Sequence, residues 1–183
     1  MEPEHNILIA TVRNAGDGDT NARAALYRQF SKAMFNICFR MLGNRENAED
    51  ILQEAFIIAF NKLHQLKDEL SFGGWLKRIV VSECIRFNKK GFKWNELSEQ
   101  YEERSDDNDA SWMHNISFEY INSEIKQLPE GCRQVFNLYV VEDYSHKEIA
   151  EILKISESTS KSQYHRARQL LKERLLKQQV LHG

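Results

Sequence analysis

The sequence has few residues that interrupt helices, form disulfides or bind metals. Its 183 residues include 8 glycines, 2 prolines and 3 cysteines. Because glycine and proline are the residues least favourable inside helices, their scarcity favours a mainly helical chain. The cysteines are odd in number and far apart, so we expect small buried thiols in a reducing compartment rather than a disulfide framework. No residues have the spacing of a metal site.

Features that enzymes, membrane proteins and secreted proteins need are also missing from the sequence. It has no nucleophile with an adjacent base and no glycine-rich loop that would hold a phosphate, so we expect no catalytic activity and no cofactor. No apolar run is long enough to span a bilayer, so we expect no membrane insertion. The N-terminal stretch MEPEHNILIATVRN carries acids where a signal peptide carries bases, so we expect a cytoplasmic protein.

The formal net charge of -2 conceals a strong segregation of charge along the chain. Residues 21–93 hold 13 bases against 7 acids, and residues 126–183 hold 10 bases against 7 acids. Residues 94–125 hold only Arg104 against nine acids. Basic blocks on both sides of an acidic segment are typical of a nucleic-acid-binding protein. Because residues 95–117 show no sustained hydrophobic period, we expect an all-α protein of two small helical domains joined by a flexible acidic linker.

The clearest local pattern lies in residues 144–175 and predicts a helix-turn-helix. Ser145 and Glu148 have the spacing of a capping box, and after a short break Ser156 is a natural N-cap for a second helix. One stripe of the second helix faces a core and comprises Ser160, Tyr164, Ala167 and Leu171. The opposite stripe is polar and basic and comprises Ser158, Lys161, Ser162, His165 and Arg168. Such a face suits the major groove of DNA, although a helical hairpin with a solvated basic face would give the same pattern.

Residues 118–144 predict two helices that support the helix-turn-helix. The first begins near Phe118, and the second begins at Pro129 and continues to Tyr144. We expect the buried residues of the second helix to be Val135, Phe136, Leu138, Tyr139 and Val140.

Residues 1–93 predict a separate set of helices. We expect a short helix over residues 5–15 and a longer one that is capped by Thr20 and terminated by Gly43. A third, capped by Asn47, should continue to Leu66. Its second stripe is mostly acidic and polar around one isoleucine, and comprises Asp50, Gln53, Glu54, Ile57 and Asn61. This stripe is either an ordinary solvated face or a docking surface for a basic partner helix.

Residues 67–93 combine aromatic and basic side chains. We expect a loop that contains Phe72 and a helix that begins at Trp75. Bases neutralise phosphates and aromatic rings stack on unpaired bases, so this mixture suits melted or single-stranded nucleic acid. The alternative is that Trp75 and Phe87 are core residues and the bases only a solubilising face.

Four stretches, in this order, resemble a bacterial RNA polymerase sigma factor of the extracytoplasmic-function (ECF) group, and together they cover nearly the full length. Ala48-Glu49-Asp50 with Gln53-Glu54-x-Phe56 resembles sigma region two. Phe72-x-x-Trp75-Leu76-x-x-Ile79 resembles the promoter-melting segment. Leu128-Pro129-x-x-x-Arg133-x-Val135-Phe136 resembles region four, as does the helix-turn-helix with Ile155-Ser156-x-x-Thr159-x-Lys161-Ser162-x-x-x-Arg166-Ala167-Arg168.

The resemblance implies that residues 1–93 bind polymerase and melt the minus-ten element, that residues 94–117 are the linker, and that residues 118–183 bind the minus-35 element. The residues implied to dock on the β-prime clamp helices are Asp50, Gln53, Glu54 and Ile57. Those implied to contact minus-ten DNA are Phe72, Trp75, Lys77, Ser82, Arg86, Lys89 and Lys90. Those implied to contact minus-35 DNA are Ser158, Thr159, Lys161, Ser162, His165, Arg166 and Arg168. The implied partners are RNA polymerase core (β-prime clamp helices and β flap), promoter DNA, and an anti-sigma factor or other recruiting protein.

Some positions depart from the family pattern. Ser82 stands where many members carry an asparagine in the helix that holds a flipped base. Ser160 and Tyr164 replace branched aliphatic residues in the core of the recognition helix, and a buried hydroxyl there needs a hydrogen-bond partner. Gln163 replaces a frequent base, so we expect weak DNA binding by the second domain alone.

Two other functions are compatible with parts of the pattern. A stand-alone helix-turn-helix regulator would bind operator DNA through residues 145–175 without polymerase. A pure protein-interaction module would tolerate replacement of Lys161, His165 and Arg168 without effect on transcription. Neither function needs the aromatic and basic segment after Phe72, so the sigma-factor interpretation is favoured.

Overall fold

The computed structural model describes residues 2–89 and 118–182, and every regular element in these ranges is a helix. The chain divides into two units, Met1–Phe92 and Lys93–Gly183. The expected all-α fold is confirmed. The acidic linker that we expect at residues 94–117 lies outside the described residues.

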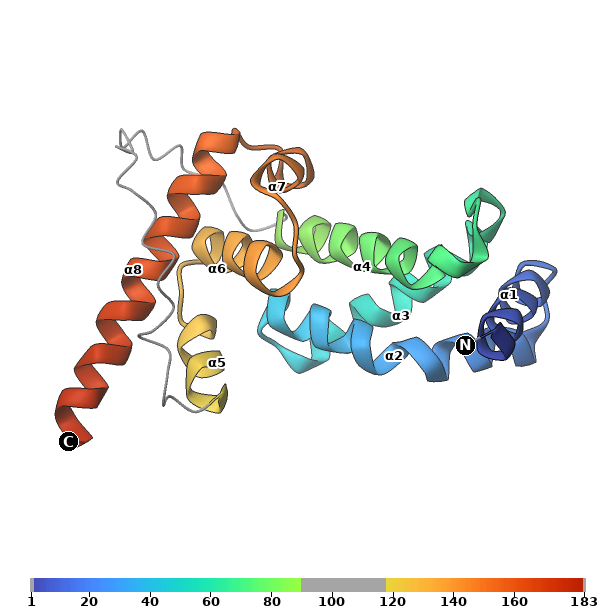
Figure 1. The fold of residues 1–183 in the computed structure, drawn as a ribbon, viewed down its shortest axis with the longest axis horizontal. Coiled ribbons are helices and arrows are strands. Elements are labelled where there is room, and N and C mark those ends of the chain that lie inside the picture. The colour runs from blue at the N-terminus through green and yellow to red at the C-terminus, as the bar shows by residue number, and fades with distance from the viewer. Residues whose placement is uncertain (1, 90–117, 183) are drawn as a thin grey trace. The chain divides into compact units, whose positions relative to one another are not determined.

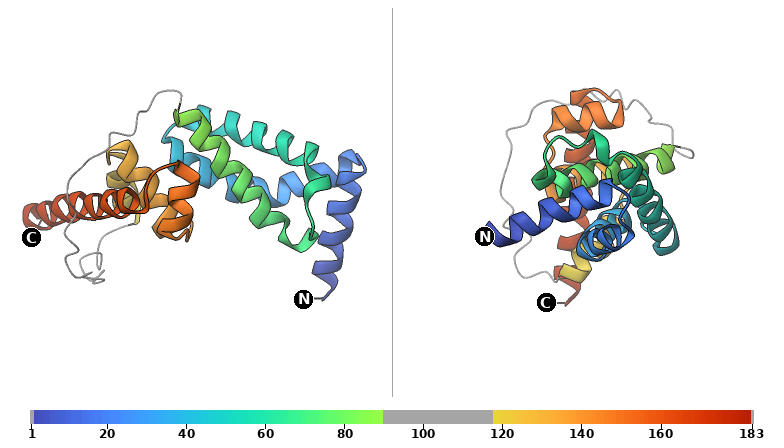
Figure 2. Two further views of the ribbon diagram at one scale, coloured as in Figure 1. Left: turned by 90° about the horizontal axis from the view of Figure 1, so that it is seen from above. Right: turned by 90° about the vertical axis from the view of Figure 1, so that its right-hand side faces the viewer.

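The described part of the first unit, residues 2–89, contains four α-helices and two short 3₁₀ turns. Figure 1 shows how these helices are arranged. The elements are α1 (Glu2–Gly16), α2 (Thr20–Leu42), α3 (Arg45–Asn61), η1 (Leu63–Gln65), η2 (Glu69–Ser71) and α4 (Phe72–Lys89). Helices α2, α3 and α4 pack against one another, and α1 packs across the beginning of α2 (Figures 1 and 2). Their shared core is apolar, and its largest fully buried side chains are Phe72, Leu26, Met41 and Leu76.

The helix boundaries of the first unit differ from the expected ones at two N-termini. Asp19, not Thr20, caps α2, because its side-chain oxygen accepts hydrogen bonds from the amides of Asn21 (2.8 Å) and Ala22 (3.3 Å). Likewise Asn44, not Asn47, caps α3, and its side chain accepts a hydrogen bond from the amide of Asn47 at 3.0 Å.

The ends of these helices are partly as expected. Gly43 ends α2 in the left-handed conformation, at φ 71°, which confirms its expected role as terminator. Helix α3 ends at Asn61 rather than at Leu66, and the chain continues into η1. Helix α4 begins at Phe72, three residues before the expected start at Trp75.

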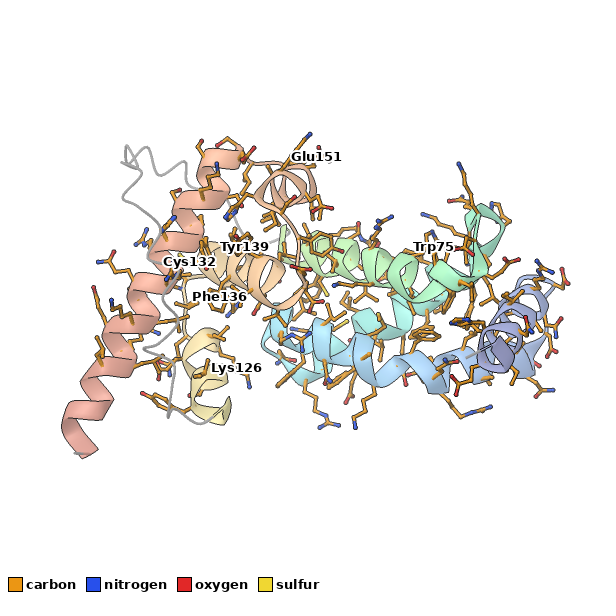
Figure 3. The ribbon with its side chains drawn as sticks, viewed as in Figure 1. Trp75, Lys126, Cys132, Phe136, Tyr139 and Glu151 are labelled. Carbon is orange, nitrogen blue, oxygen red and sulfur yellow. The ribbon has the colours of Figure 1, made fainter. Side chains whose placement is uncertain are left out.

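The second unit contains the supporting helices and the helix-turn-helix. Its elements are α5 (Phe118–Lys126), α6 (Glu130–Phe136), η4 (Asn137–Val141), α7 (His146–Leu153) and α8 (Glu157–His182). A core forms where α5 and α6 meet α8, and its buried residues include Ile125, Leu128, Phe136, Leu171 and Leu175. Figure 3 shows Cys132 and Phe136 on α6, at the side that faces α8.

The helix that begins after Pro129 does not continue regularly to Tyr144. After Phe136 it widens into η4, a π-helical turn in which the amide of Glu142 donates to the carbonyl of Asn137 at 3.0 Å. Within this turn Tyr139 and Val140 are 37% and 48% exposed, so the expectation that both are core residues is wrong.

Candidate polymerase and DNA interfaces

The helix-turn-helix is built from local capping interactions. Ser145 and Glu148 form the expected capping box, in which the amide of Ser145 donates to the Glu148 carboxylate at 2.9 Å. Lys154 ends α7 in the left-handed conformation (φ 60°, ψ 46°), and residues 154–156 form the short turn to α8. Ser156 then accepts a hydrogen bond from the amide of Thr159 at 2.9 Å and so caps α8, as expected.

The inner side of α8 carries a buried polar contact to α7. Ser160 is fully buried, and its Oγ lies 2.9 Å from Nδ1 of His146. The His146 ring stacks on Tyr139, with ring centroids 4.3 Å apart, and Tyr139 in turn lies 4.6 Å from the Tyr164 ring. Tyr139 is labelled in Figure 3. The hydroxyl that replaces an aliphatic side chain at position 160 therefore has the partner that its burial requires.

The outward face of α8 carries the residues implied to contact the minus-35 element. Two of them, Ser158 and Arg166, are exposed. The others are half-buried, and they are Thr159, Lys161, Ser162, His165 and Arg168. Two of the cations have intramolecular contacts, because Lys161 Nζ lies 3.1 Å from the Glu157 carboxylate and Arg168 lies over the Tyr164 ring at 5.8 Å.

Gln163 does not belong to this outward face. It is buried, and its side-chain oxygen accepts a hydrogen bond from the Cys132 thiol at 3.1 Å. The expectation that Gln163 lowers the positive charge available to DNA phosphates is therefore wrong, because the side chain points into the core. Burial raises the pKa of the Cys132 thiol, which keeps it protonated and able to donate this hydrogen bond.

The stripe implied to dock on polymerase lies on the surface of α3. Asp50, Gln53, Glu54 and Ile57 are all exposed, and Ile57 is 60% exposed despite its apolar side chain. Beside the stripe is an open pocket of about 340 Å³ between α2 and α3. Its lining mixes aromatic, polar and charged side chains, namely Tyr27, Ser31, Lys32, Phe35, Arg45, Glu49, Leu52 and Gln53. The stripe and the pocket share Gln53, so the exposed surface continues from α3 onto α2.

The residues implied to contact minus-ten DNA are distributed differently from the expectation. Phe72 is fully buried and packs edge-on against Phe30, with ring centroids 5.2 Å apart. Since α4 begins at this residue, its ring points into the bundle and is not accessible to DNA. Trp75, which Figure 3 labels, lies one turn further along α4 and is half-buried. Its ring centroid is 6.1 Å from that of Phe72.

Among the polar members of this group, Lys77 is half-buried, and Ser82 and Arg86 are exposed. Lys90 and the side chain of Lys89 lie outside the described part of the chain. The residues of the minus-ten group that the structure describes all lie on α4, and the buried Phe72 ring packs against the Trp75 ring.

Arg86 takes part in an ion-pair cluster that links α4 to α3. Its Nη2 lies 2.5 Å from the Glu54 carboxylate and 2.5 Å from the Glu83 carboxylate, and its Nε donates to Glu83 at 2.7 Å. The hydrogen bonds to Glu54 and then to Glu83 raise the pKa of the Arg86 guanidinium. We call Glu54, Glu83 and Arg86 the Arg86 cluster. The spacing of Glu83 and Arg86 on one helix indicates their pairing, but no sequence pattern indicates the contact with Glu54.

Two negative findings concern the described residues only. They contain no group of three or more His, Cys, Asp or Glu side chains that could hold a metal ion. None of the helices in these ranges is long and apolar enough to cross a bilayer.

Comparison with known proteins supports this organisation of the chain. Residues 26–91 match the family model of Sigma-70 region 2, and residues 118–171 match that of Sigma-70 region 4. The chain is 31% identical over 176 residues to the ECF RNA polymerase sigma factor SigW of Bacillus subtilis, covering 90% of this chain and 94% of that protein. It is 29% identical over 157 residues to the RNA polymerase sigma factor YlaC of the same organism, covering 83% and 91% respectively.

Solved structures of other proteins share the fold, among them two complexes. One is CnrH in complex with the cytosolic domain of CnrY, with a TM-score of 0.53 at 21% identity over 91% of this chain and 95% of that chain. The other is RpoE from Bartonella quintana in complex with the anti-sigma factor NepR, with a TM-score of 0.53 at 18% identity over 84% and 96% of the two chains. Together with the near full-length similarity to SigW, these findings show that the chain belongs to the ECF group of bacterial RNA polymerase sigma factors.

Proposed function

We propose that this sigma factor uses three separate surfaces to bind RNA polymerase core and to direct it to promoters. The observation that carries the proposal is that both sigma regions occur in one chain, and that each has its implied surface outward. An exposed acidic and apolar stripe lies on α3, an aromatic and basic surface lies on α4, and a helix-turn-helix is formed by α7 and α8. Catalysis belongs to the polymerase in this proposal, and the protein acts in the cytoplasm.

The docking surface for the β-prime clamp helices is the stripe of Asp50, Gln53, Glu54 and Ile57. Exposed carboxylates around an apolar side chain complement a partner helix that presents basic residues around an apolar one. The pocket beside Gln53 gives this surface a concave part, which a flat solvated helix face would lack. The β flap of the polymerase is the proposed partner of the second unit.

The minus-ten surface consists of Trp75, Lys77, Ser82 and Arg86, together with Lys89 and Lys90. The Trp75 ring stacks on an unpaired base, and the basic side chains contact the phosphates. Phe72 is excluded from direct contact with DNA because it is buried. Its role in the proposal is to hold the Trp75 ring in place.

The minus-35 surface is the outward face of α8, with Ser158, Thr159, Lys161, Ser162, His165, Arg166 and Arg168. This face belongs to the second helix of the helix-turn-helix, the helix that enters the major groove in such motifs. A further proposed partner is an anti-sigma factor or another recruiting protein. It is supported by solved structures of similar fold, in which CnrH is in complex with the cytosolic domain of CnrY and RpoE is in complex with the anti-sigma factor NepR.

The test is run-off transcription with purified core polymerase on a promoter library, with and without this protein. We expect selective transcripts that disappear with Asp50→Lys, which reverses one charge of the docking stripe, and with Trp75→Ala, which removes the stacking ring. Glu4→Lys, an exposed charge reversal on α1, is the matched control and should transcribe normally. Circular dichroism verifies that each variant is folded.

The two losses should arise at different steps. Asp50→Lys should fail to bind core, whereas Trp75→Ala should bind core and fail to open the promoter. A protein that yields no transcript with core, yet binds specific duplex DNA alone, would contradict the proposal and favour an operator-binding regulator.

A further inference from the structure

We propose that the Arg86 cluster couples polymerase docking to DNA binding: Glu54 and Glu83 hold the Arg86 guanidinium in the free protein, and a polymerase cation that binds Glu54 leaves Glu83 as its one partner in the cluster, which makes Arg86 easier for DNA to capture. The inference rests on the proposed function, because it requires Glu54 to face polymerase and Arg86 to face DNA. It adds that the internal ion pairs occupy the atoms that both roles require.

The geometry shows why the internal ion pairs oppose contacts of Arg86 with DNA and of Glu54 with polymerase. Arg86 uses Nε and Nη2, two adjacent donors on one edge of the guanidinium, to bind the two carboxylates. The same pair of adjacent donors can bind a phosphate in a bidentate manner. Glu54 in turn uses one carboxylate oxygen for Arg86, 32 residues away in the sequence. A basic side chain of the polymerase that takes this oxygen would therefore weaken the hold on Arg86.

Glu83 is the positioning residue of the cluster. Its side chain is only 12% exposed, compared with 46% for Glu54 and 55% for Arg86. Glu83 is thus the member that solvent and partners reach least, and it binds Arg86 through both Nε and Nη2. Because Glu83 holds the guanidinium beside α3, Arg86 lies within reach of Glu54 when the protein is free.

The coupling must be reciprocal, since a single contact opposes both binding events. Polymerase binding should raise the affinity for single-stranded DNA, and loss of Arg86 should raise the affinity for polymerase. Arg86 and Glu54, the two side chains that the coupling joins, are both about half exposed, so the expected coupling is about two- to five-fold. A coupling of this size favours binding of polymerase before DNA and still allows the reverse order.

The first experiment measures binding of a fluorescein-labelled single-stranded oligonucleotide to the full chain without polymerase, by fluorescence anisotropy. Glu83→Gln keeps the shape of the side chain and removes its charge, so we expect binding about two- to five-fold tighter than wild type. The dependence of log affinity on log salt should become steeper by about 0.7, the value for one added phosphate contact on a single strand.

A double-mutant cycle separates this effect from a general change of charge. In the Arg86→Gln background, Glu83→Gln should give no gain, because there is no guanidinium to release. Glu49→Gln is the matched control for DNA binding, since it opens the exposed Arg45–Glu49 pair, which lies within α3 and does not involve Arg86, and removes the same charge. A gain from Glu83→Gln that persists without Arg86, or an equal gain from Glu49→Gln, would overturn the inference.

The second experiment measures core polymerase affinity and does not depend on DNA binding by the free chain. Arg86→Gln should bind core about two- to five-fold more tightly than wild type, because the Glu54 carboxylate is no longer held by the Arg86 guanidinium. Unchanged or weaker core binding would refute the coupling. If the wild-type protein neither binds core nor supports transcription, the proposed function fails as well. If it does both and the cycle shows no coupling, only the further inference fails.

Discussion

Replacement of Ser160 by alanine tests how the two helices of the helix-turn-helix are held together. The Ser160 hydroxyl is fully buried on α8 and lies 2.9 Å from Nδ1 of His146 on α7. Alanine removes this hydrogen bond and leaves the backbone and the neighbouring side chains in place. Since a helix-turn-helix presents its second helix only when the first helix supports it, weakening this contact should loosen α7 against α8.

The expected size follows from three contributions. Loss of the net hydrogen bond costs about 0.5–1.5 kcal/mol. The higher helix propensity of alanine returns a few tenths of a kcal/mol, about the difference between the two residues in a helix interior. His146 is half-buried, so its ring nitrogen can find water, which limits any further cost. We therefore expect Ser160→Ala to lower the local stability by about 0.5–1 kcal/mol.

His146→Phe removes the same hydrogen bond from the other side. A phenyl ring keeps a flat partner for Tyr139, but it leaves the buried Ser160 hydroxyl without His146. That costs about 1–3 kcal/mol, unless the hydroxyl turns to the carbonyl of the preceding helical turn. In the double variant no hydroxyl remains to be satisfied. Its loss should therefore be smaller than the sum of the two single losses by about 1 kcal/mol.

The assay must report on the second unit alone. All three tryptophans lie at or before Trp112, so tryptophan fluorescence does not probe residues 118–183. Native-state hydrogen exchange of the α7 and α8 amides measures the free energy of local opening directly. Unchanged protection of these amides in Ser160→Ala would refute a stabilising role of the hydrogen bond between Ser160 and His146. Strictly additive losses in the double variant would refute it as well.

Four further predictions concern stability, reactivity and binding. Lys154→Gly should stabilise the protein by up to about 1 kcal/mol in urea denaturation, because glycine adopts its φ of 60° without strain, and a destabilised variant would contradict this. Leu171→Ala should lose about 2–5 kcal/mol in the same assay, since its side chain is fully buried, and a loss below 1 kcal/mol would show that the core repacks. Native Cys84 and Cys132 should react slowly with iodoacetamide at neutral pH and quickly after unfolding: the hydrogen bond to Cys38 and then burial raise the pKa of Cys84, and burial raises that of Cys132. Rapid native labelling of either thiol would contradict this. In a gel-shift assay without polymerase, the full chain should bind promoter duplex weakly and with strong salt dependence, and tight salt-insensitive binding would count against this.

The features that the sequence predicts correctly depend on atoms close together in the chain. The capping box of Ser145 and Glu148, the cap at Ser156 and the terminator Gly43 each involve a residue and the backbone within about one helical turn. Propensity and side-chain chemistry decide such contacts almost without reference to the rest of the fold. The same holds for the exposure of the α3 stripe, which follows from its spacing relative to the buried stripe.

Where two neighbouring residues can perform the same local role, the sequence does not decide between them. Asp19 and Thr20 are both good N-caps, as are Asn44 and Asn47. The turn that leads into the helix makes the choice, because it determines which side chain is positioned to accept the first free amides. In both cases the cap lies earlier in the chain than expected.

Contacts between distant residues are the part that sequence patterns miss. Phe72 lies in a segment of aromatic and basic side chains, and the sequence therefore suggests that it contacts DNA. In the structure it is buried against Phe30 on another helix. The link between Arg86 and Glu54 joins α4 to α3 and has no periodic signature. Similarly, the resemblance leads us to expect Gln163 on the DNA-facing side of the recognition helix, yet it turns inward to Cys132.

Weak DNA binding by the second unit is still expected, although for a different physical reason than the one that the sequence suggests. Gln163 lies in the core and takes no charge from the recognition face. Instead, Lys161 is paired with Glu157, and Arg168 lies over Tyr164, so both cations must exchange an internal contact for a phosphate. Each exchange reduces the net gain on DNA. Polymerase offsets this by holding both units on one duplex, because tethering turns the second binding event into an intramolecular one. Weak individual surfaces then make occupancy of the promoter depend on polymerase, which is the behaviour that a specificity subunit needs.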